Sequence, residues 1–102
     1  MDIKELTKFM HDFARAKGWY EPDSTHPQTL RNLAISLNLE ASEILEHFQW
    51  NGELDDIDGL SGELADVALY LLQISSLSGI DLEDAILRKL ESNYNRSWGE
   101  ER

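Results

Sequence analysis

The chain has 102 residues, of which 41% are hydrophobic and 28% are charged, and its formal net charge is −11. This size and composition are typical of one globular domain and exclude a disordered chain. The acidic balance also argues against binding to a nucleic-acid backbone, which requires a basic surface. No apolar run reaches the ~20 residues that span a membrane, and there is no cysteine for a disulfide framework. We therefore expect residues 1–102 to form a single cytoplasmic domain.

The first half of the chain predicts two amphipathic helices. The first runs from about residue 3 to residue 17, and Gly18 ends it. Its alternation of apolar and charged residues is unlike the apolar core of a signal peptide. After a loop with two prolines, the second helix runs from about residue 29 to residue 50, with apolar residues at a period of 3.6.

The second half predicts two more helices, and no segment alternates like a β-strand. The third helix starts near Ser61, after an acidic loop, and ends at Gly79. Asp81 is a suitable N-cap for the fourth helix. Short connections between helices of this length favour a mostly antiparallel, four-helix-bundle-like fold. The sequence therefore predicts an all-α protein.

The third helix is apolar around most of its circumference, which requires burial on more than one side. Its apolar residues include Val67, Leu69, Leu71, Leu72, Ile74 and Leu77. One chain of four helices supplies that burial poorly, whereas a second copy supplies it well. We therefore expect a homodimer, or a dimer-of-dimers tetramer, that completes the bundle.

Two pairs of acids stand in otherwise apolar helical sequence: Glu40-x-x-Glu43 and Glu63-x-x-Asp66. Residues three apart share a helix face, so each pair presents two carboxylates side by side. Asp66 is the only charged residue between Leu64 and Ser78, and a carboxylate there is unfavourable unless it is paired or bound to a cation. The alternative is that all four acids are solvated surface residues.

Four converging carboxylates would suit a hard cation, above all Mg²⁺, with Mn²⁺ as an alternative ion. Bound Mg²⁺ retains open positions for phosphate oxygens and lowers the pKa of a coordinated water. A neighbouring carboxylate can then accept the proton of that water. The motif therefore indicates a phosphate-processing enzyme, and it leaves open whether one metal or two would bind.

Three segments carry a resemblance to a known family: LEASEILEHFQW (39–50), ELADVALYLLQISSLSGIDL (63–82) and KLESNYNR (89–96). From about Leu6 to Trp98 the chain resembles the MazG-like nucleotide pyrophosphohydrolases, and within them the small single-domain branch that includes dCTP pyrophosphatase. The resemblance implies Mg²⁺-dependent hydrolysis of a nucleoside triphosphate, in particular a deoxynucleoside triphosphate, between the α and β phosphates. Nucleoside monophosphate and pyrophosphate would be the products.

Carried over to this chain, the resemblance assigns Glu40, Glu43, Glu63 and Asp66 as metal ligands and Glu43 as the residue that helps to deprotonate the attacking water. Many members begin the first motif with two adjacent acids, whereas here Leu39 precedes Glu40. The family ending K-x-x-x-N-x-x-R/K implies a role in binding the triphosphate for three residues: Lys89, Asn93 and Arg96. Without the resemblance, we would expect Lys89 and Arg96 to be solvated surface residues.

Base recognition requires flat apolar surfaces and a few polar partners. The candidates are Trp19, His26, Trp50 and Tyr70, and the resemblance adds Asn32; each aromatic residue has an alternative role in the core. His47 lies one turn beyond Glu43 without a second histidine at ligand spacing, and it is expected to be peripheral to the site.

A second hypothesis is a non-catalytic, acidic helical module that dimerises and binds protein partners, in which the third helix serves only as an interface. The residues do not decide the preferred base or sugar, or whether the nucleotide is canonical or modified.

Overall fold

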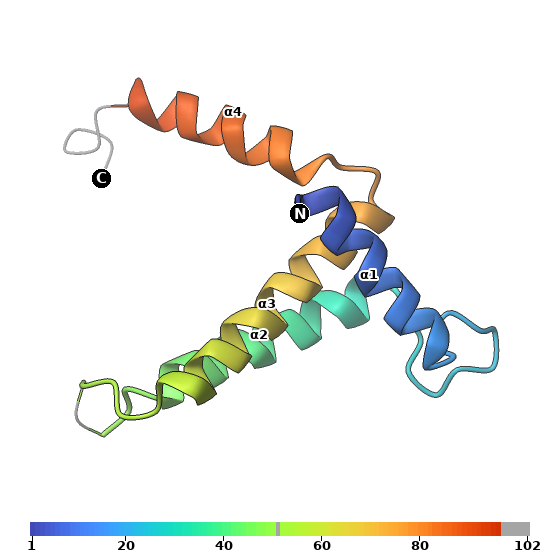
Figure 1. The fold of residues 1–102 in the computed structure, drawn as a ribbon, viewed down its shortest axis with the longest axis horizontal. Helices are drawn as coiled ribbons and strands as arrows, with labels where there is room; N and C mark the ends of the chain where they lie inside the picture. The colour runs from blue at the N-terminus through green and yellow to red at the C-terminus, as the bar shows by residue number, and fades with distance from the viewer. Residues whose placement is uncertain (51, 97–102) are drawn as a thin grey trace.

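The computed structural model describes residues 1–50 and 52–96, which form four α-helices and no β-strand (Figure 1). The helices are α1 (Ile3–Ala16), α2 (Leu30–Glu46), α3 (Ile57–Leu77) and α4 (Leu82–Tyr94). The predicted all-α fold with four helices is confirmed. In this part of the chain, no helix combines the length and the apolar content that crossing a membrane requires.

Each helix begins at a residue whose side chain caps the first turn. Asp2, Thr29, Asp56 and Asp81 each accept a hydrogen bond from the backbone N–H three residues further on, at 2.9, 3.1, 2.9 and 3.1 Å respectively. Such bonds satisfy amide groups that have no partner within the helix. The prediction of Asp81 as an N-cap is confirmed.

The start of α3 differs from the prediction. The helix begins at Ile57, four residues before the expected start at Ser61. Asp56 caps it, because its Oδ1 accepts the N–H of Gly59. The two glycines of this first stretch have low helix propensity, which hid the helical turn in the sequence.

The end of α2 also differs from the prediction, since the helix ends at Glu46 rather than near Trp50. The N–H groups of residues 47–49 bond to carbonyls three residues back, at 3.2, 3.0 and 3.3 Å. These are tighter turns than those of an α-helix. The chain therefore begins to turn toward α3 earlier than the apolar pattern indicates.

Helices α2 and α3 form a long antiparallel hairpin, and α1 crosses α3 near its C-terminal end (Figure 1). Among the residues that the structure describes, the buried apolar ones are Met10 and Ala14 of α1, Leu33 of α2 and Leu72 of α3. The core therefore lies where these three helices meet, at one end of the hairpin.

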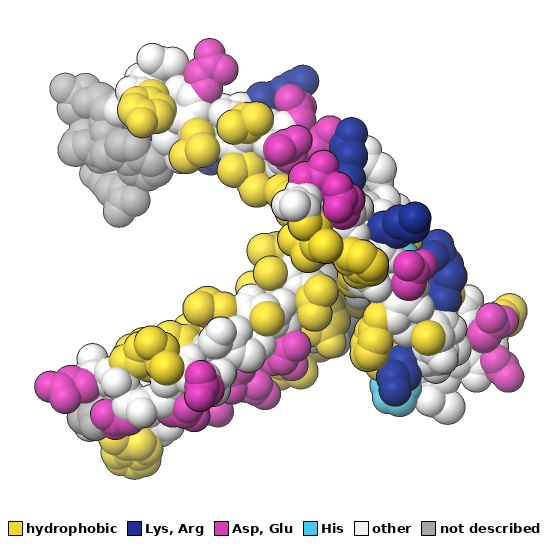
Figure 2. All heavy atoms as spheres, viewed as in Figure 1, with side chains coloured by type: hydrophobic (Ala, Val, Ile, Leu, Met, Phe, Trp, Pro, Cys, Tyr) yellow, Lys and Arg dark blue, Asp and Glu magenta, His cyan; other side chains and the backbone are white. Residues whose placement is uncertain are grey.

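Helix α4 projects away from the other three helices, and none of its residues is buried. In the space-filling view, hydrophobic side chains lie on the facing sides of α4 and the hairpin (Figure 2). The radius of gyration is 16.5 Å, whereas a compact domain of this length has about 13 Å. One chain therefore does not close the predicted bundle by itself.

Candidate active site

The acids of the two motifs influence one another across the hairpin. The pKa of Glu40 is raised, first by burial, then by the charges of Glu43 and Asp66, by a side-chain hydrogen bond with Glu43, and by the charge of Glu63. Within the described residues, the Oε2 atom of Glu40 is shielded from solvent and has no hydrogen-bond partner. An acid in this setting is unfavourable in its charged form until positive charge compensates it.

This donor set fits a hard cation, since all four candidate ligands are carboxylates. From Glu40 to Asp66 inclusive the sequence has nine acids and no lysine or arginine, so no lysine or arginine of this stretch competes with a cation for the site. Across residues 1–50 and 52–96, no three histidine, aspartate or glutamate side chains are arranged to hold a metal ion as they stand. The carboxylates would have to turn toward a common point to do so.

His47 contributes a contact that the sequence did not indicate. Its Nε2 meets Oε2 of Glu63, and both side chains are largely buried, with 13% and 24% of their surfaces exposed. His47 was expected to be peripheral, but it contacts one of the four motif acids directly. The contact depends on how the turn after α2 folds against α3, which no local pattern reveals.

An apolar pocket of about 370 Å³ opens between α1 and α3, and Glu40 and Asp66 line it. Its aromatic lining residues are Phe9, Phe13, Trp19 and Tyr70. The Phe13 and Trp19 rings meet edge to face, with centroids 5.4 Å apart. Phe13 has 53% of its surface exposed. Phe9 and Phe13 are pocket residues that were not predicted from the sequence, although their spacing of four residues places them on one helix face.

A second pocket of about 340 Å³ adjoins the first and shares Trp19 and Tyr70 with it. His26 and Asn32 also line this pocket. The Trp19 and His26 ring centroids are 6.5 Å apart, and Nδ2 of Asn32 donates to the carbonyl of Pro27 at 3.0 Å. The structure thus brings together four of the residues predicted to bind the substrate.

A chain of polar contacts anchors the loop of residues 17–29, which carries Trp19 and His26. Nδ1 of His11 lies 2.6 Å from the Tyr20 hydroxyl, and Nε2 lies 2.7 Å from Oγ of Ser76. Nε2 of the buried Gln73 lies 3.1 Å from the Tyr20 hydroxyl and 2.8 Å from Oε1 of Gln28. Burial, followed by the nearby Arg15 charge, lowers the pKa of His11. These contacts hold one wall of the second pocket against α1 and α3.

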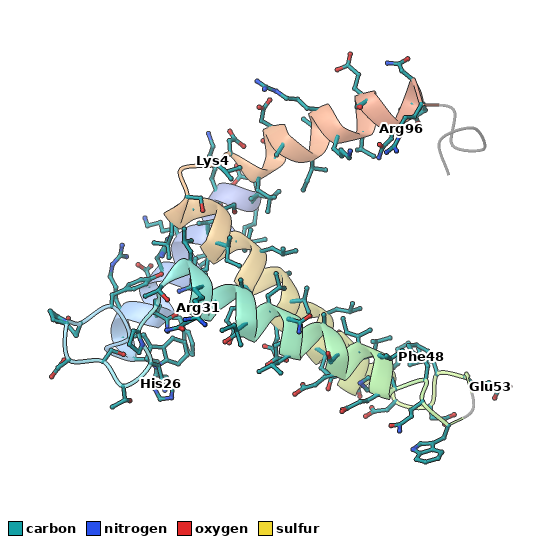
Figure 3. The ribbon with its side chains drawn as sticks, turned by 180° about the vertical axis from the view of Figure 1, so that it is seen from behind. Lys4, His26, Arg31, Phe48, Glu53 and Arg96 are labelled. Atoms are coloured by element: carbon teal, nitrogen blue, oxygen red, sulfur yellow. The ribbon has the colours of Figure 1, made fainter. Side chains whose placement is uncertain are left out.

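The other predicted substrate residues lie away from the two pockets. Trp50 follows α2 and has 87% of its surface exposed. Figure 3 shows its sequence neighbours Phe48 and Glu53 at the tip of the hairpin, far from His26. Three further predicted residues, Lys89, Asn93 and Arg96, lie on or just beyond α4. Arg96 is on the opposite arm of the molecule from His26 (Figure 3).

The fold and the site define an all-α protein in which paired E-x-x-E and E-x-x-D acids of a helical hairpin adjoin an aromatic pocket. The chain is similar to dCTP pyrophosphatase 1 of Homo sapiens and of Mus musculus, with 27% and 26% identity over 103 residues. Each match covers 92% of this chain and 58% of the relative, so the chain spans under two thirds of the length of these proteins. A dATP/dGTP diphosphohydrolase of Salmonella phage PMBT28 is 44% identical over 50 residues, which cover 45% of this chain and 17% of that protein.

No family model matches the chain. The similarity to nucleotide pyrophosphatases over most of the chain nevertheless confirms the resemblance seen in the sequence. The names of these relatives denote hydrolases of nucleoside triphosphates.

Proposed function

We propose that the protein is a nucleoside triphosphate pyrophosphohydrolase that requires Mg²⁺. The observation that carries this proposal is the buried, unpartnered Oε2 of Glu40, which belongs to a residue lining the apolar pocket together with Asp66. A carboxylate in that position lacks a compensating positive charge, and a divalent cation would supply it. The names of the similar proteins support a nucleotide as the substrate.

In this proposal Glu40, Glu43, Glu63 and Asp66 hold the metal, directly or through water. Bound Mg²⁺ would supply charge neutralisation at the phosphates and a more acidic water. Glu43 accepts the proton of the water that attacks the α phosphorus. The bond between the α phosphorus and the oxygen that bridges the α and β phosphates breaks, and this oxygen leaves with pyrophosphate. The other product is the nucleoside monophosphate.

The two adjoining pockets suit the remainder of the nucleotide. Trp19 and Tyr70 line both pockets, and the first pocket supplies the flat aromatic surfaces that a base stacks on. His26 and Asn32 line the second pocket and offer polar groups to the base or the sugar. We place base and sugar in these pockets, with the phosphates directed toward the carboxylates.

We further propose that a second copy of this chain packs between α4 and the hairpin. The apolar residues Ile86, Leu87 and Leu90 of α4 have 44%, 60% and 51% of their surfaces exposed, and a 13-residue helix is marginally stable without packing. This assembly would be a homodimer or a dimer of dimers. It would allow Lys89, Asn93 and Arg96 to reach phosphates bound by the other copy.

The reaction is tested by incubating the purified protein with Mg²⁺ and a panel of canonical and modified nucleoside triphosphates, with separate assays for pyrophosphate and orthophosphate. Asp66→Asn is the site variant, and Asp58→Asn, an exposed position on the same helix, is its matched control. We expect pyrophosphate release from the wild type and from the Asp58 variant, and none from the Asp66 variant. Release of orthophosphate would place cleavage at the β–γ bond and refute the proposed reaction.

Assembly is tested by sedimentation of the wild type and of Leu87→Glu, which we expect to be a monomer. If no nucleotide is cleaved while the protein folds and self-associates, the result favours the second hypothesis, a helical interaction module. A cytoplasmic location, expected from the lack of cysteine, stays a prediction.

A further inference from the structure

His47 is the C-cap residue of α2, and its ring reaches across the hairpin to α3. Its Nε2 meets Oε2 of Glu63, the first acid of the second motif. Only 13% of the histidine side chain is exposed. The contact therefore joins the two helices that carry the motif acids, in a region largely shielded from water.

The first turn of α3 leaves room for this ring. A Cβ atom on Gly59 would lie 3.1 Å from Cε1 of His47 and 2.3 Å from Oδ2 of Asp56. Asp56 is fixed in turn, because its Oδ1 caps α3 by accepting the N–H of Gly59 at 2.9 Å. The ring of His47 is thus held between the capped turn and the Glu63 carboxyl.

A histidine with its proton on Nε2 donates to Oε2 of Glu63 and leaves the other carboxylate oxygen available. Side chains that coordinate metals are commonly oriented by an outer hydrogen bond, and loss of that bond weakens metal binding. We propose that His47 is a positioning residue that holds the Glu63 carboxylate in the orientation required for Mg²⁺. This inference rests on the proposed function, which makes Glu63 a metal ligand.

A contact that served only to join the hairpin would have a different signature. Its loss would lower the melting temperature and leave the affinity for Mg²⁺ unchanged in the folded protein. A positioning role instead requires a donor at the place of Nε2. Glutamine can place its amide nitrogen there, whereas the shorter asparagine cannot reach and leucine has no donor.

The experiment compares His47→Gln, His47→Asn and His47→Leu with the wild type and with Glu63→Gln. Mg²⁺ affinity is measured without nucleotide, by calorimetric titration and by the rise in melting temperature with Mg²⁺ concentration. In a second assay with a nucleoside triphosphate, the Mg²⁺ concentration for half-maximal rate is determined separately from kcat. Circular dichroism establishes that each variant is folded.

We expect the leucine and asparagine variants to bind Mg²⁺ about 10- to 100-fold more weakly than the wild type, and the glutamine variant to stay within about threefold of it. Wild-type affinity in the folded asparagine or leucine variant would overturn the positioning role, as would equal weakening in all three. If His47→Leu does not fold, the Mg²⁺ affinities of the glutamine and asparagine variants alone decide whether His47 is a positioning residue. Absence of Mg²⁺ binding and of hydrolysis in the wild type would instead refute the proposed function itself.

Discussion

Replacing Glu40 by glutamine is expected to raise the melting temperature of the metal-free protein at neutral pH. The Oε2 atom of Glu40 is buried without a partner in the described part of the chain. Burial, followed by the influence of the other three motif acids, raises the pKa of this residue. Leaving a buried polar atom unsatisfied costs about 1–3 kcal/mol. The amide N–H of glutamine can remove this cost by donating to the neighbouring carboxylates, which the ionised Glu40 carboxylate cannot do. Because Glu40 retains a hydrogen bond with Glu43, we take the lower end, about 1 kcal/mol. For a domain of this size that corresponds to a rise of about 4–8 °C.

The pH dependence of this effect has a defined sign. A raised pKa means that the folded chain holds the Glu40 proton more tightly than the unfolded chain does. The wild type therefore loses stability relative to Glu40→Gln as the pH rises from the ordinary carboxyl pKa through the raised value. The two proteins should melt alike at about pH 3, where the carboxyl is protonated in both states. Their difference in melting temperature should increase from there toward pH 8, as the carboxyl of the folded wild type ionises.

The assay is thermal denaturation in EDTA across this pH range, with Glu46→Gln as the control. Glu46 is exposed on the same helix, and its replacement changes the net charge equally. Saturating Mg²⁺ should reverse the order of stability, because a ligand at 100 times its Kd contributes ~2.7 kcal/mol to the wild type alone. Equal shifts in the two variants, or a lower melting temperature for Glu40→Gln at neutral pH, would refute the reasoning.

Two further predictions concern the hairpin. Gly59→Ala should destabilise the protein by about 0.5–2 kcal/mol, because the new methyl group would lie 2.3 Å from Oδ2 of Asp56 and would displace the side chain that caps α3. Gly62→Ala, with nothing within 4 Å, should instead stabilise the protein by up to about 1 kcal/mol. Urea denaturation of both variants checks these two predictions. Leu33→Ala should lower the free energy of unfolding by about 2–5 kcal/mol, since only 2% of Leu33 is exposed. Leu39→Ala, at a position 61% exposed, should change the free energy of unfolding by less than about 1 kcal/mol. Similar losses at both leucines would contradict a core located where α1, α2 and α3 meet.

The helices were predictable because their signals are local. Gly18 and Gly79 have φ values of 73° and 72°, and they end α1 and α3 in the left-handed conformation that glycine adopts easily. Asp81 was recognised as a cap by the same kind of local pattern. The early start of α3 was not predicted because the cap of Asp56 had to compete with the low helix propensity of two glycines.

The site was predictable only in part. The motif spacing identified Glu40 and Asp66 as candidate metal ligands, and both residues line the aromatic pocket. The contact of His47 with Glu63 depends on the register between α2 and α3, which sequence periodicity does not define. The position of α4 likewise depends on what the helix packs against. Its amphipathic pattern identified an apolar face but not the direction in which the helix leaves α3.

The isolation of α4 has a consequence for local unfolding. A cooperative unit is as stable as the contacts that hold it, and none of the residues of α4 is buried. In the single chain, its amide hydrogens should therefore exchange with solvent almost as fast as those of an isolated peptide, while those of the hairpin near Leu33 and Leu72 exchange slowly. Protection of the α4 amides then becomes a direct measure of assembly, because it should increase with protein concentration while protection near the core does not.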